Sequence, residues 1–277
     1  MIYPHFSRLF LILFSLFLIS CNNETETNEE NTITHISRFK AKYMEYPDPL
    51  TYMPSESEPE IVTLEYDNGK IVKKMGDIIY GVSTSGIPYM LSKKIYAHVA
   101  YANNKITITK KFTVPDMISN YKKELFLSGN QIEKIVKYDP NQNSGYDTIS
   151  IYYNNQKIIK TISRYNYPKG ESVYHYNSNN NLDSIITRYY QYDDLTDTMY
   201  IDYNSKSRNK ITFSEYDNAD NPLKNLIIFD ETYYRALSQN NYKKIKYQSF
   251  NNTGTVISST EKNWNLIYQN GNVDFSQ

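Results

Sequence analysis

The side chains that most often carry out chemistry in proteins are few and scattered in this 277-residue chain. None of its four histidines has a His, Asp or Glu partner at the spacing of a metal-binding motif. These histidines are His5, His35, His98 and His175. The nine glycines form neither a Gly-x-Ser-x-Gly nucleophile elbow nor a glycine-rich phosphate loop. The sequence therefore predicts no metal centre and no cofactor.

Two groups of aspartates are the remaining candidates for chemistry. Asp193, Asp194 and Asp197 form one group, and Asp217 and Asp220 form the other. Their oxygens could bind Ca²⁺ in a loop, or two carboxylates could act as the acid and base of a glycosidase. The spacing does not match an EF-hand, and Asp commonly caps turns with its own side chain. We therefore expect turn chemistry here and a protein that is not an enzyme.

Cys21 is the only cysteine, which excludes an intramolecular disulfide. It follows Arg8 and an apolar run, Leu9–Ile19, that is shorter than the roughly 20 apolar residues of a membrane-spanning helix. That run has the length of a signal-peptide apolar region. The segment Leu18-Ile19-Ser20-Cys21 resembles the bacterial lipobox. We predict a signal peptide at residues 1–20 and lipidation of Cys21, with an ordinary signal peptide as the alternative.

Residues 21–60 are predicted to be a lipidated tether and a proline-rich lead-in. Asn22–Asn31 contains no apolar residue and cannot form a core. Its acidic residues resemble the surface-export signals of Bacteroidota lipoproteins, and a plain solvated linker is the alternative. We expect a lipid-anchored protein of the outer membrane, either periplasmic or surface-exposed. The β-domain is predicted to span residues 61–277.

The composition favours strands and turns, and it gives no indication of nucleic-acid binding. Lys plus Arg and Asp plus Glu are balanced at 30 each, so no basic surface for nucleic acid is expected. The chain has 29 Tyr and 11 Phe but one Trp. Aromatic residues are enriched in strands, whereas Asn and Ser favour turns. This balance predicts an all-β protein.

A hairpin pattern repeats from Ile61 onward. In the first unit, Asn68-Gly69 separates two apolar runs and is a strong hairpin signal, because both turn positions need positive φ. Five further turns are predicted at Asn103-Asn104, Gly129-Asn130, Asn154-Asn155, 177–181 and 204–207. Alternating apolar and polar residues place each set on one face of a sheet. We predict an antiparallel meander of hairpins in one twisted, curved sheet.

One segment departs from the hairpin pattern. Leu223–Leu237 has apolar residues at helical spacing, with Asn221 as a candidate cap and Pro222 in the first turn. We predict one short helix in the C-terminal third that covers part of a sheet face, with an irregular loop as the alternative. Strands are predicted to resume at 243–250, 255–259 and 264–268.

Two motifs resemble a known family. Glu65–Ile71 resembles the YD-type β-repeat, in which a Tyr-Asp pair is closely followed by Gly, a polar residue and an aliphatic one. Glu215–Pro222, followed by Ser238–Asn241, looks like the C-terminal signature of a Bacteroidota lipoprotein family of unknown function with degenerate YD-type hairpins. The resemblance covers Ile61–Gly271. It implies a β-hairpin domain and an envelope location, and it brings no catalytic residues.

Tyrosine stripes are the candidate binding face. They could stack on sugars or dock an extended strand. The alternative is sheet coverage through cross-strand pairs, and sugar platforms usually use Trp, of which Trp264 is the only example. The candidate residues are Tyr152, Tyr153, Tyr189, Tyr190 and Tyr192.

Three triplets of Asp, then Ser or Thr, then an apolar residue resemble the O-glycosylation sequon of Bacteroidota. Their acceptors are Thr148, Ser184 and Thr198. The alternative is that these triplets are strand starts after polar turns.

We expect a non-catalytic cell-envelope lipoprotein that presents a Tyr-rich sheet surface to a glycan, a peptide or another envelope protein. The alternative is a periplasm-facing carrier or assembly factor that holds an apolar ligand in the curved sheet. A continuous apolar concave face would favour the carrier. A concave face covered by Tyr and Thr would favour binding at the surface.

Overall fold

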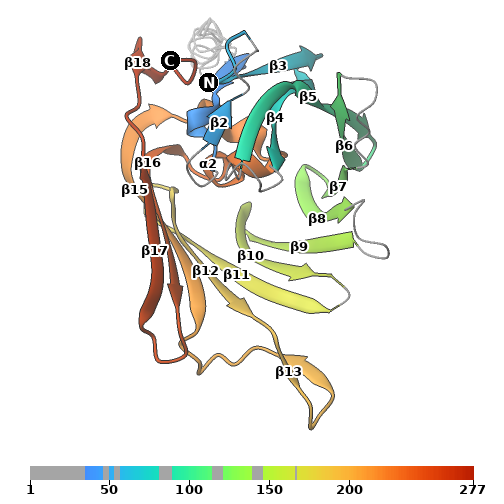
Figure 1. Cartoon of the computed structure of the whole chain (residues 1–277), viewed down its shortest axis with the longest axis vertical. Helices are drawn as coiled ribbons and strands as arrows, with labels where there is room; N and C mark the ends of the chain where they lie inside the picture. The colour runs from blue at the N-terminus through green and yellow to red at the C-terminus, as the bar shows by residue number, and fades with distance from the viewer. Residues whose placement is uncertain are drawn as a thin grey trace, which may run out of the picture. The chain divides into compact units, whose positions relative to one another are not determined.

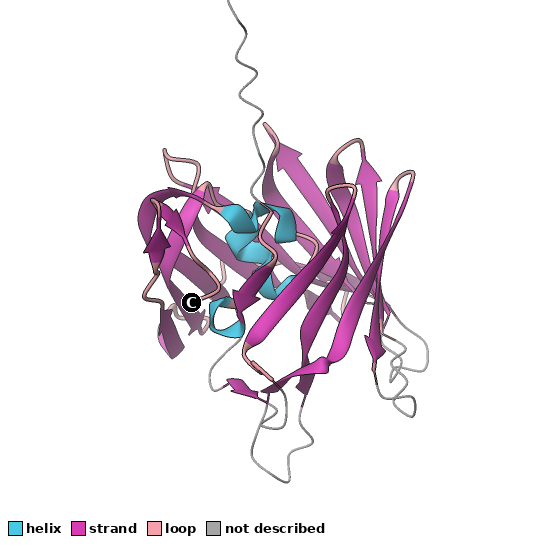
Figure 2. Cartoon of the chain, turned by 90° about the horizontal axis from the view of Figure 1, so that it is seen from above, coloured by secondary structure: helices cyan, strands magenta, loops and turns pink. Residues whose placement is uncertain are grey.

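The computed structural model describes residues 35–45, 50–52, 57–80, 89–113, 121–138, 146–165 and 167–277. These residues belong to one compact unit, His35–Gln277. An antiparallel meander sheet dominates the unit and curves around a short helical region (Figures 1 and 2). The predicted all-β fold is confirmed.

The main sheet has 15 strands, and 14 of them follow one another across it in the order β1, β3 to β12, β15, β16 and β17. Their bounds are β1 (Arg38–Lys40), β3 (Ile61–Asp67), β4 (Lys70–Tyr80), β5 (Tyr89–Ala102), β6 (Lys105–Phe112), β7 (Lys122–Ser128), β8 (Gln131–Tyr138), β9 (Tyr146–Asn154), β10 (Lys157–Arg164), β11 (Pro168–Tyr176), β12 (Leu182–Tyr189), β15 (Arg208–Asp220), β16 (Asn240–Phe250) and β17 (Val256–Asn263). The remaining strand, β2 (Leu50–Tyr52), pairs in parallel with β5. Two small sheets lie outside the main one: β13 (Gln191–Asp193) with β14 (Thr198–Tyr200), and β18 (Tyr268–Gln269) with β19 (Asn272–Val273).

Local turn signals placed the first five hairpins correctly. Asn68 and Gly69 join β3 to β4 with φ values of 47° and 74°, the positive values that their turn requires. The pairs β5–β6, β7–β8, β9–β10 and β11–β12 also form. Their turns lie at the predicted positions or one residue away.

The sixth predicted hairpin, with its turn at 204–207, is wrong. The chain reverses earlier, between β13 and β14, because Asp193 accepts hydrogen bonds from the Leu195 N–H (2.9 Å) and the Thr196 hydroxyl (2.8 Å). Strand β15 consequently pairs with β12 and β16. The strand predicted at 264–268 is also mostly absent. Trp264 is buried there, and its indole N–H donates to the carbonyl oxygen of Lys42.

The predicted helix is shorter than its apolar spacing suggested. The α-helix α2 spans only Tyr233–Ala236, preceded by the 3₁₀ turns η3 (Pro222–Leu226) and η4 (Asp230–Thr232). The predicted cap is correct, because the Asn221 side chain accepts from the Leu223 N–H at 3.0 Å. Phe229 is extended and divides the helical turns. We call Asn221–Ser238 the inner segment, because it packs within the curve of the sheet (Figure 2).

The first described residues join the same core. In the lead-in, η1 (Ala41–Tyr43) is largely buried, and the Lys40 N–H donates to the carbonyl oxygen of Phe275 at 2.7 Å. The rings of Tyr43 and Phe275 meet edge to face, with centroids 4.9 Å apart. The two ends of the compact unit therefore contact each other.

Candidate functional site

The concave side of the sheet, which we call its inner face, has a charged half and a second half. We call the second half uncharged because its three central rows hold no Lys, Arg, Asp or Glu. Contacts with the inner segment identify this face. Lys123 on β7 pairs with Asp230, and the ring of Phe213 on β15 packs edge-on against Tyr234 with centroids 5.7 Å apart. Because side chains alternate along each strand, the paired registers assign the remaining residues to one face or the other.

The charged half lies on β4 to β8 and holds the inner segment. Asp230 pairs with Lys123 at 3.0 Å and with Lys137 at 2.9 Å, and Glu231 pairs with the buried Lys74. Partial burial would raise the pKa of Asp230, but the two lysines lower it overall. Burial lowers the pKa of Lys74 to about 8, against the opposing effect of Asp77. These lysines and acids neutralise one another, so they serve as anchors for the inner segment.

A second cluster fixes α2. Arg235 is 1% exposed, and its guanidinium donates to the carbonyl oxygens of Tyr43 (2.9 Å) and Tyr242 (3.1 Å). It also stacks on the rings of Tyr242 and Trp264 at 4.2 and 4.3 Å. The carboxylate of Glu45 accepts from the backbone N–H groups of Tyr234 and Arg235 and from the Tyr242 hydroxyl. Burial raises the pKa of Glu45 to about 7 despite these donors.

The uncharged half carries a row of small polar side chains across six neighbouring strands, β10, β11, β12, β15, β16 and β17. Each residue in the row is the direct cross-strand partner of the next. The polar row consists of Thr161, Ser172, Thr187, Asn209, Ser249 and Ser258. The hydroxyls of Ser172 and Thr187 hydrogen-bond at 2.7 Å. The Asn209 amide donates to the Tyr189 hydroxyl at 2.7 Å, which places Tyr189 beside the row.

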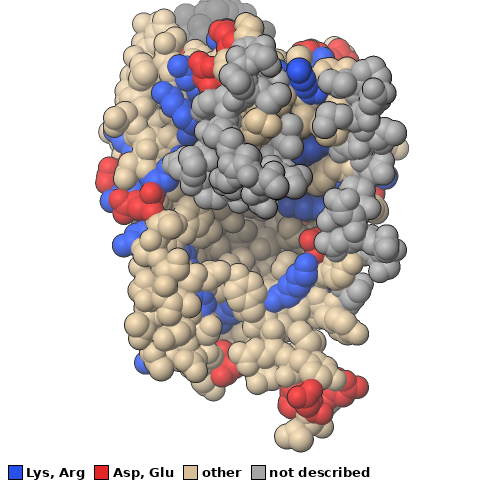
Figure 3. Space-filling view, viewed as in Figure 1, with Lys and Arg blue, Asp and Glu red and all other residues tan. Residues whose placement is uncertain are grey.

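The outer face of the same strands differs in charge. One outer row pairs Lys160, Val173, Ile186, Lys210, Gln248 and Ser259. Another contains Glu171 beside Arg188. The inner rows on either side of the polar row are uncharged: Ile149, Ser163, Gly170 and Tyr189 on one side, and Tyr174, Ile185, Ile211, Tyr247 and Thr260 on the other. The lack of charge is therefore a property of this part of the inner face. In the space-filling view, the molecule is hollowed near its centre, and Lys or Arg side chains lie beside the hollow (Figure 3).

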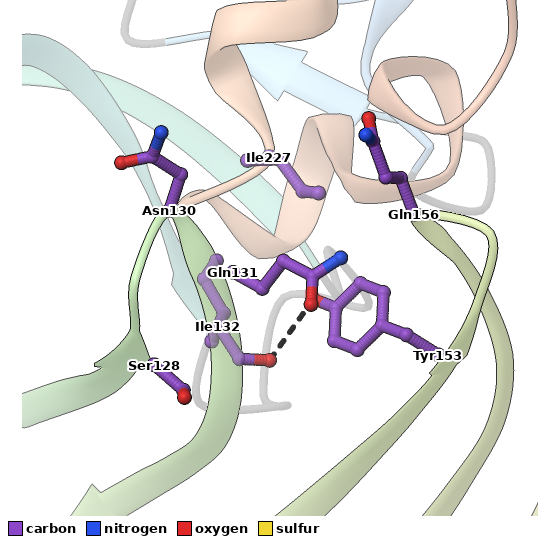
Figure 4. A pocket seen from close by; sticks show the side chains of 7 residues that line it. All are labelled: Ser128, Asn130, Gln131, Ile132, Tyr153, Gln156 and Ile227. Atoms are coloured by element: carbon purple, nitrogen blue, oxygen red, sulfur yellow. Dashed lines mark hydrogen bonds between the residues drawn. The ribbon is translucent and has the colours of Figure 1, made fainter.

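A pocket of about 480 Å³ opens between the β7–β8 turn, the β9–β10 turn and the inner segment (Figure 4). Its lining is Ser128, Asn130, Gln131, Ile132, Tyr153, Gln156 and Ile227. The Tyr153 hydroxyl donates to the carbonyl oxygen of Ile132 at 3.0 Å, and burial raises the pKa of Tyr153, which keeps the phenol neutral. Three amides, a hydroxyl and an aromatic ring on an aliphatic base suit a neutral polar ligand.

The five tyrosines of the candidate binding face do not share one surface. Tyr153 lines the pocket, and Tyr189, which is 54% exposed, lies beside the polar row. Tyr152 is on the outer face, where the Lys160 ammonium sits 4.8 Å from its ring. Tyr192 belongs to the β13–β14 hairpin and donates to Asp197, and Tyr190 is half-buried next to that hairpin. The side-chain period of two separates Tyr152 from Tyr153.

The other candidate residues lie apart from the concave site. Asp217 accepts from the Asn241 side chain and the Tyr268 hydroxyl, and Asp220 accepts from Gln239. In the described part of the chain, no three His, Cys, Asp or Glu residues are grouped to hold a metal ion.

The three acceptors of the glycosylation triplets differ in exposure. Thr198 is exposed on β14, Thr148 is half-buried on β9, and Ser184 is 5% exposed within β12. Cys21 and His5 lie outside the described residues. Among the described helices, none combines the length and apolarity needed to span a bilayer.

Sequence reasoning missed the polar row, Glu45 and Arg235. Serine and threonine in strands give no signal until register places them side by side. Glu45 and Arg235 are 190 residues apart. The alternation of Thr and Ser with apolar residues was the one available clue to the row. It indicates which residues of one strand share a face, but not which residues of the neighbouring strands lie beside them.

Comparisons with known proteins found similarity to solved structures alone. No protein-family model matches the chain, and no curated protein matches its sequence. A porin-like protein from Bacteroides vulgatus ATCC 8482 is 16% identical with a TM-score of 0.47, covering 82% of this chain and 90% of that one. A porin-like protein from Bacteroides uniformis ATCC 8492 is 12% identical with a TM-score of 0.40, covering 80% and 90%. At these values the likeness carries no inference about function. The structure itself shows an all-β chain with a curved sheet and a polar row on its inner face.

Proposed function

We propose that this protein is a non-catalytic, lipid-anchored protein of the cell envelope whose inner sheet face binds a neutral glycan. The polar row is the observation that carries the binding proposal. Its hydroxyl and amide groups can both donate and accept hydrogen bonds, as sugar hydroxyls do. Tyr189 adds an exposed aromatic ring beside the row, and Tyr153 adds a ring in the pocket. Aromatic rings offer a flat apolar surface for a sugar.

The polar row makes the inner face a poor binding surface for an apolar ligand. A carrier would bury the ligand against a continuous apolar surface, because burial of apolar area drives such binding. Here Ser, Thr and Asn occupy the middle row, and the inner segment fills the charged half. An apolar ligand would bury the remaining hydrogen-bonding capacity of these side chains without satisfying it, at about 1–3 kcal/mol for each buried group left unpaired.

A charged ligand and a peptide are also less favoured. The three inner rows have no Lys, Arg, Asp or Glu with which to pair a charged group. Peptides commonly bind by extending a sheet through backbone hydrogen bonds at an edge strand. The polar row runs instead across the face of strands whose backbone groups are already paired.

The lipid anchor rests on the N-terminal pattern that ends at Cys21. Cells grown with an alkyne-tagged palmitate should incorporate the tag into the wild-type protein and not into the Cys21→Ser variant. Protease shaving of intact cells would then separate a surface location from a periplasmic one. Labelling of the serine variant would sink the lipoprotein part of the proposal.

The binding proposal is tested with the purified mature chain and Thr187→Lys, which places bulk and charge in the polar row. We expect at least one neutral oligosaccharide from a cello-, xylo- and malto-series to bind the wild type and not this variant. Thr212→Lys is the matched control, because Thr212 is also half-buried but lies on the outer face, opposite Ser184. An equal loss of oligosaccharide binding in Thr187→Lys and Thr212→Lys would contradict a site on the inner face. Failure of the wild type and of Thr212→Lys to bind any of these oligosaccharides would also contradict it.

A further inference from the structure

The polar row has the spacing of a polymer-binding surface. Neighbouring strands lie about 4.8 Å apart, so six side chains in register span about 24 Å. The spacing of about 4.8 Å between neighbouring strands is close to the length of one pyranose residue in an extended glycan. A peptide strand advances by about 3.4 Å per residue, so its side chains would fall out of step with the row.

The two ends of the polar row differ in exposure. Thr161 is buried beneath Tyr174, whose hydroxyl lies 3.4 Å from the threonine hydroxyl. The four central residues are half-buried, and Ser258 on β17 is exposed. The row is therefore closed at Thr161 and open at Ser258, with five positions from Ser172 to Ser258 available to a ligand.

The ring of Tyr189 lies beside the polar row and close to the sheet. Its cross-strand partner is Gly170, and a Cβ atom on that glycine would come within 3.4 Å of the Tyr189 ring. Because glycine has no side chain, the ring can rest close to the sheet. A ring in this position offers its surface to a sugar bound in the first open positions of the row.

We infer that the polar row binds the end of a neutral, extended polysaccharide that crosses the strands, with one sugar residue for each of the five strands β11, β12, β15, β16 and β17. This inference rests on the proposed function and adds the form of the ligand. The chain end lies near Thr161, and the rest of the polymer leaves over β17. The unbranched polymer contacts the protein over about five residues, whatever its total length.

The test is the dependence of affinity on ligand length, measured by isothermal titration calorimetry on the mature chain. The probes are the cello-, xylo- and malto-oligosaccharides of two, four, six and eight residues. In the series that binds, affinity should rise at least tenfold from two to six residues and then remain level from six to eight.

A single-residue change locates the far end of the site. Ser258→Ala should weaken binding of the six-residue ligand about threefold, the usual effect of one hydrogen bond, and leave the two-residue ligand unchanged. Ser259→Ala is the matched control, because Ser259 is equally exposed but pairs with Gln248 on the outer face. It should change neither ligand. Both side chains are exposed, so neither change threatens folding.

The outcomes separate the two proposals. If ligands of two and six residues bind equally and Thr187→Lys abolishes both, the glycan-binding function stands and the extended-chain inference is overturned. The inference is also overturned if Ser258→Ala has no effect on the longer ligands. If no oligosaccharide of any length binds, the proposed function itself fails.

Discussion

Replacing Glu45 by Gln tests whether a partly buried carboxyl sets the pH dependence of stability. Burial raises the pKa of Glu45 from its ordinary value of 4.5 to about 7. Between these values the folded chain holds a proton that the unfolded chain releases, so the free energy of unfolding falls as the pH rises through about 7. One pKa unit corresponds to about 1.4 kcal/mol, so the loss between about pH 5.5 and pH 8.5 is about 2 kcal/mol.

The measurement is urea unfolding at several pH values, followed by the fluorescence of Trp264. This residue is the only tryptophan and stacks on Arg235, whose backbone N–H donates to Glu45. Gln keeps an acceptor for the N–H groups of α2 but cannot lose a proton. The difference in unfolding free energy between wild type and Glu45→Gln should therefore change by about 2 kcal/mol across this range.

Glu124→Gln is the matched control. Hydrogen bonds from Lys105 and Tyr138 hold the pKa of Glu124 at about 2, so Glu124 stays charged in the folded chain throughout the range. Its difference from wild type should not vary with pH above about 5.5. If the wild type and Glu45→Gln keep a constant difference across the range, the assignment of the titration to Glu45 is refuted.

Three further changes address the inner segment and the anchor. Asp230→Asn should lower the free energy of unfolding by about 2 kcal/mol, because it leaves the buried Lys123 unpaired while Asp230 itself is 42% exposed. Adding Lys123→Met should recover most of that loss in urea unfolding, and a double variant less stable than Asp230→Asn would contradict this reasoning. Arg235→Met should cost about 3–5 kcal/mol, since two buried carbonyl oxygens and two ring contacts lose their partner; a midpoint shift equal to that of the exposed Lys224→Met would contradict it. Cys21→Ser should move the protein from the membrane to the soluble fraction of cell extracts, and an unchanged distribution would contradict lipid anchoring.

The features that could be predicted from the sequence depend on neighbouring residues. Asn68-Gly69 determines its hairpin because both residues adopt positive φ at little cost, and Asn221 caps Leu223 two positions away. The β13–β14 reversal shows the limit of such signals, because the Asp193 side chain stabilises a turn that competes with the one predicted at 204–207. The helix α2 is shorter than the sequence predicts, since apolar spacing does not report that Phe229 is extended.

What only the tertiary structure decided is which distant residues share a surface. The polar row runs from Thr161 to Ser258, and each member is an ordinary strand residue until register aligns it with the next. Glu45 meets the N–H groups of α2 only because the curved sheet brings the first described residues onto the inner segment. Backbone conformation follows from short-range preferences, whereas the composition of a sheet face follows from pairings between strands that are far apart in the chain. The sequence alone therefore determined the first five hairpins and predicts the anchor at Cys21, whereas the fold determined that Ser, Thr and Asn form a row on the inner face.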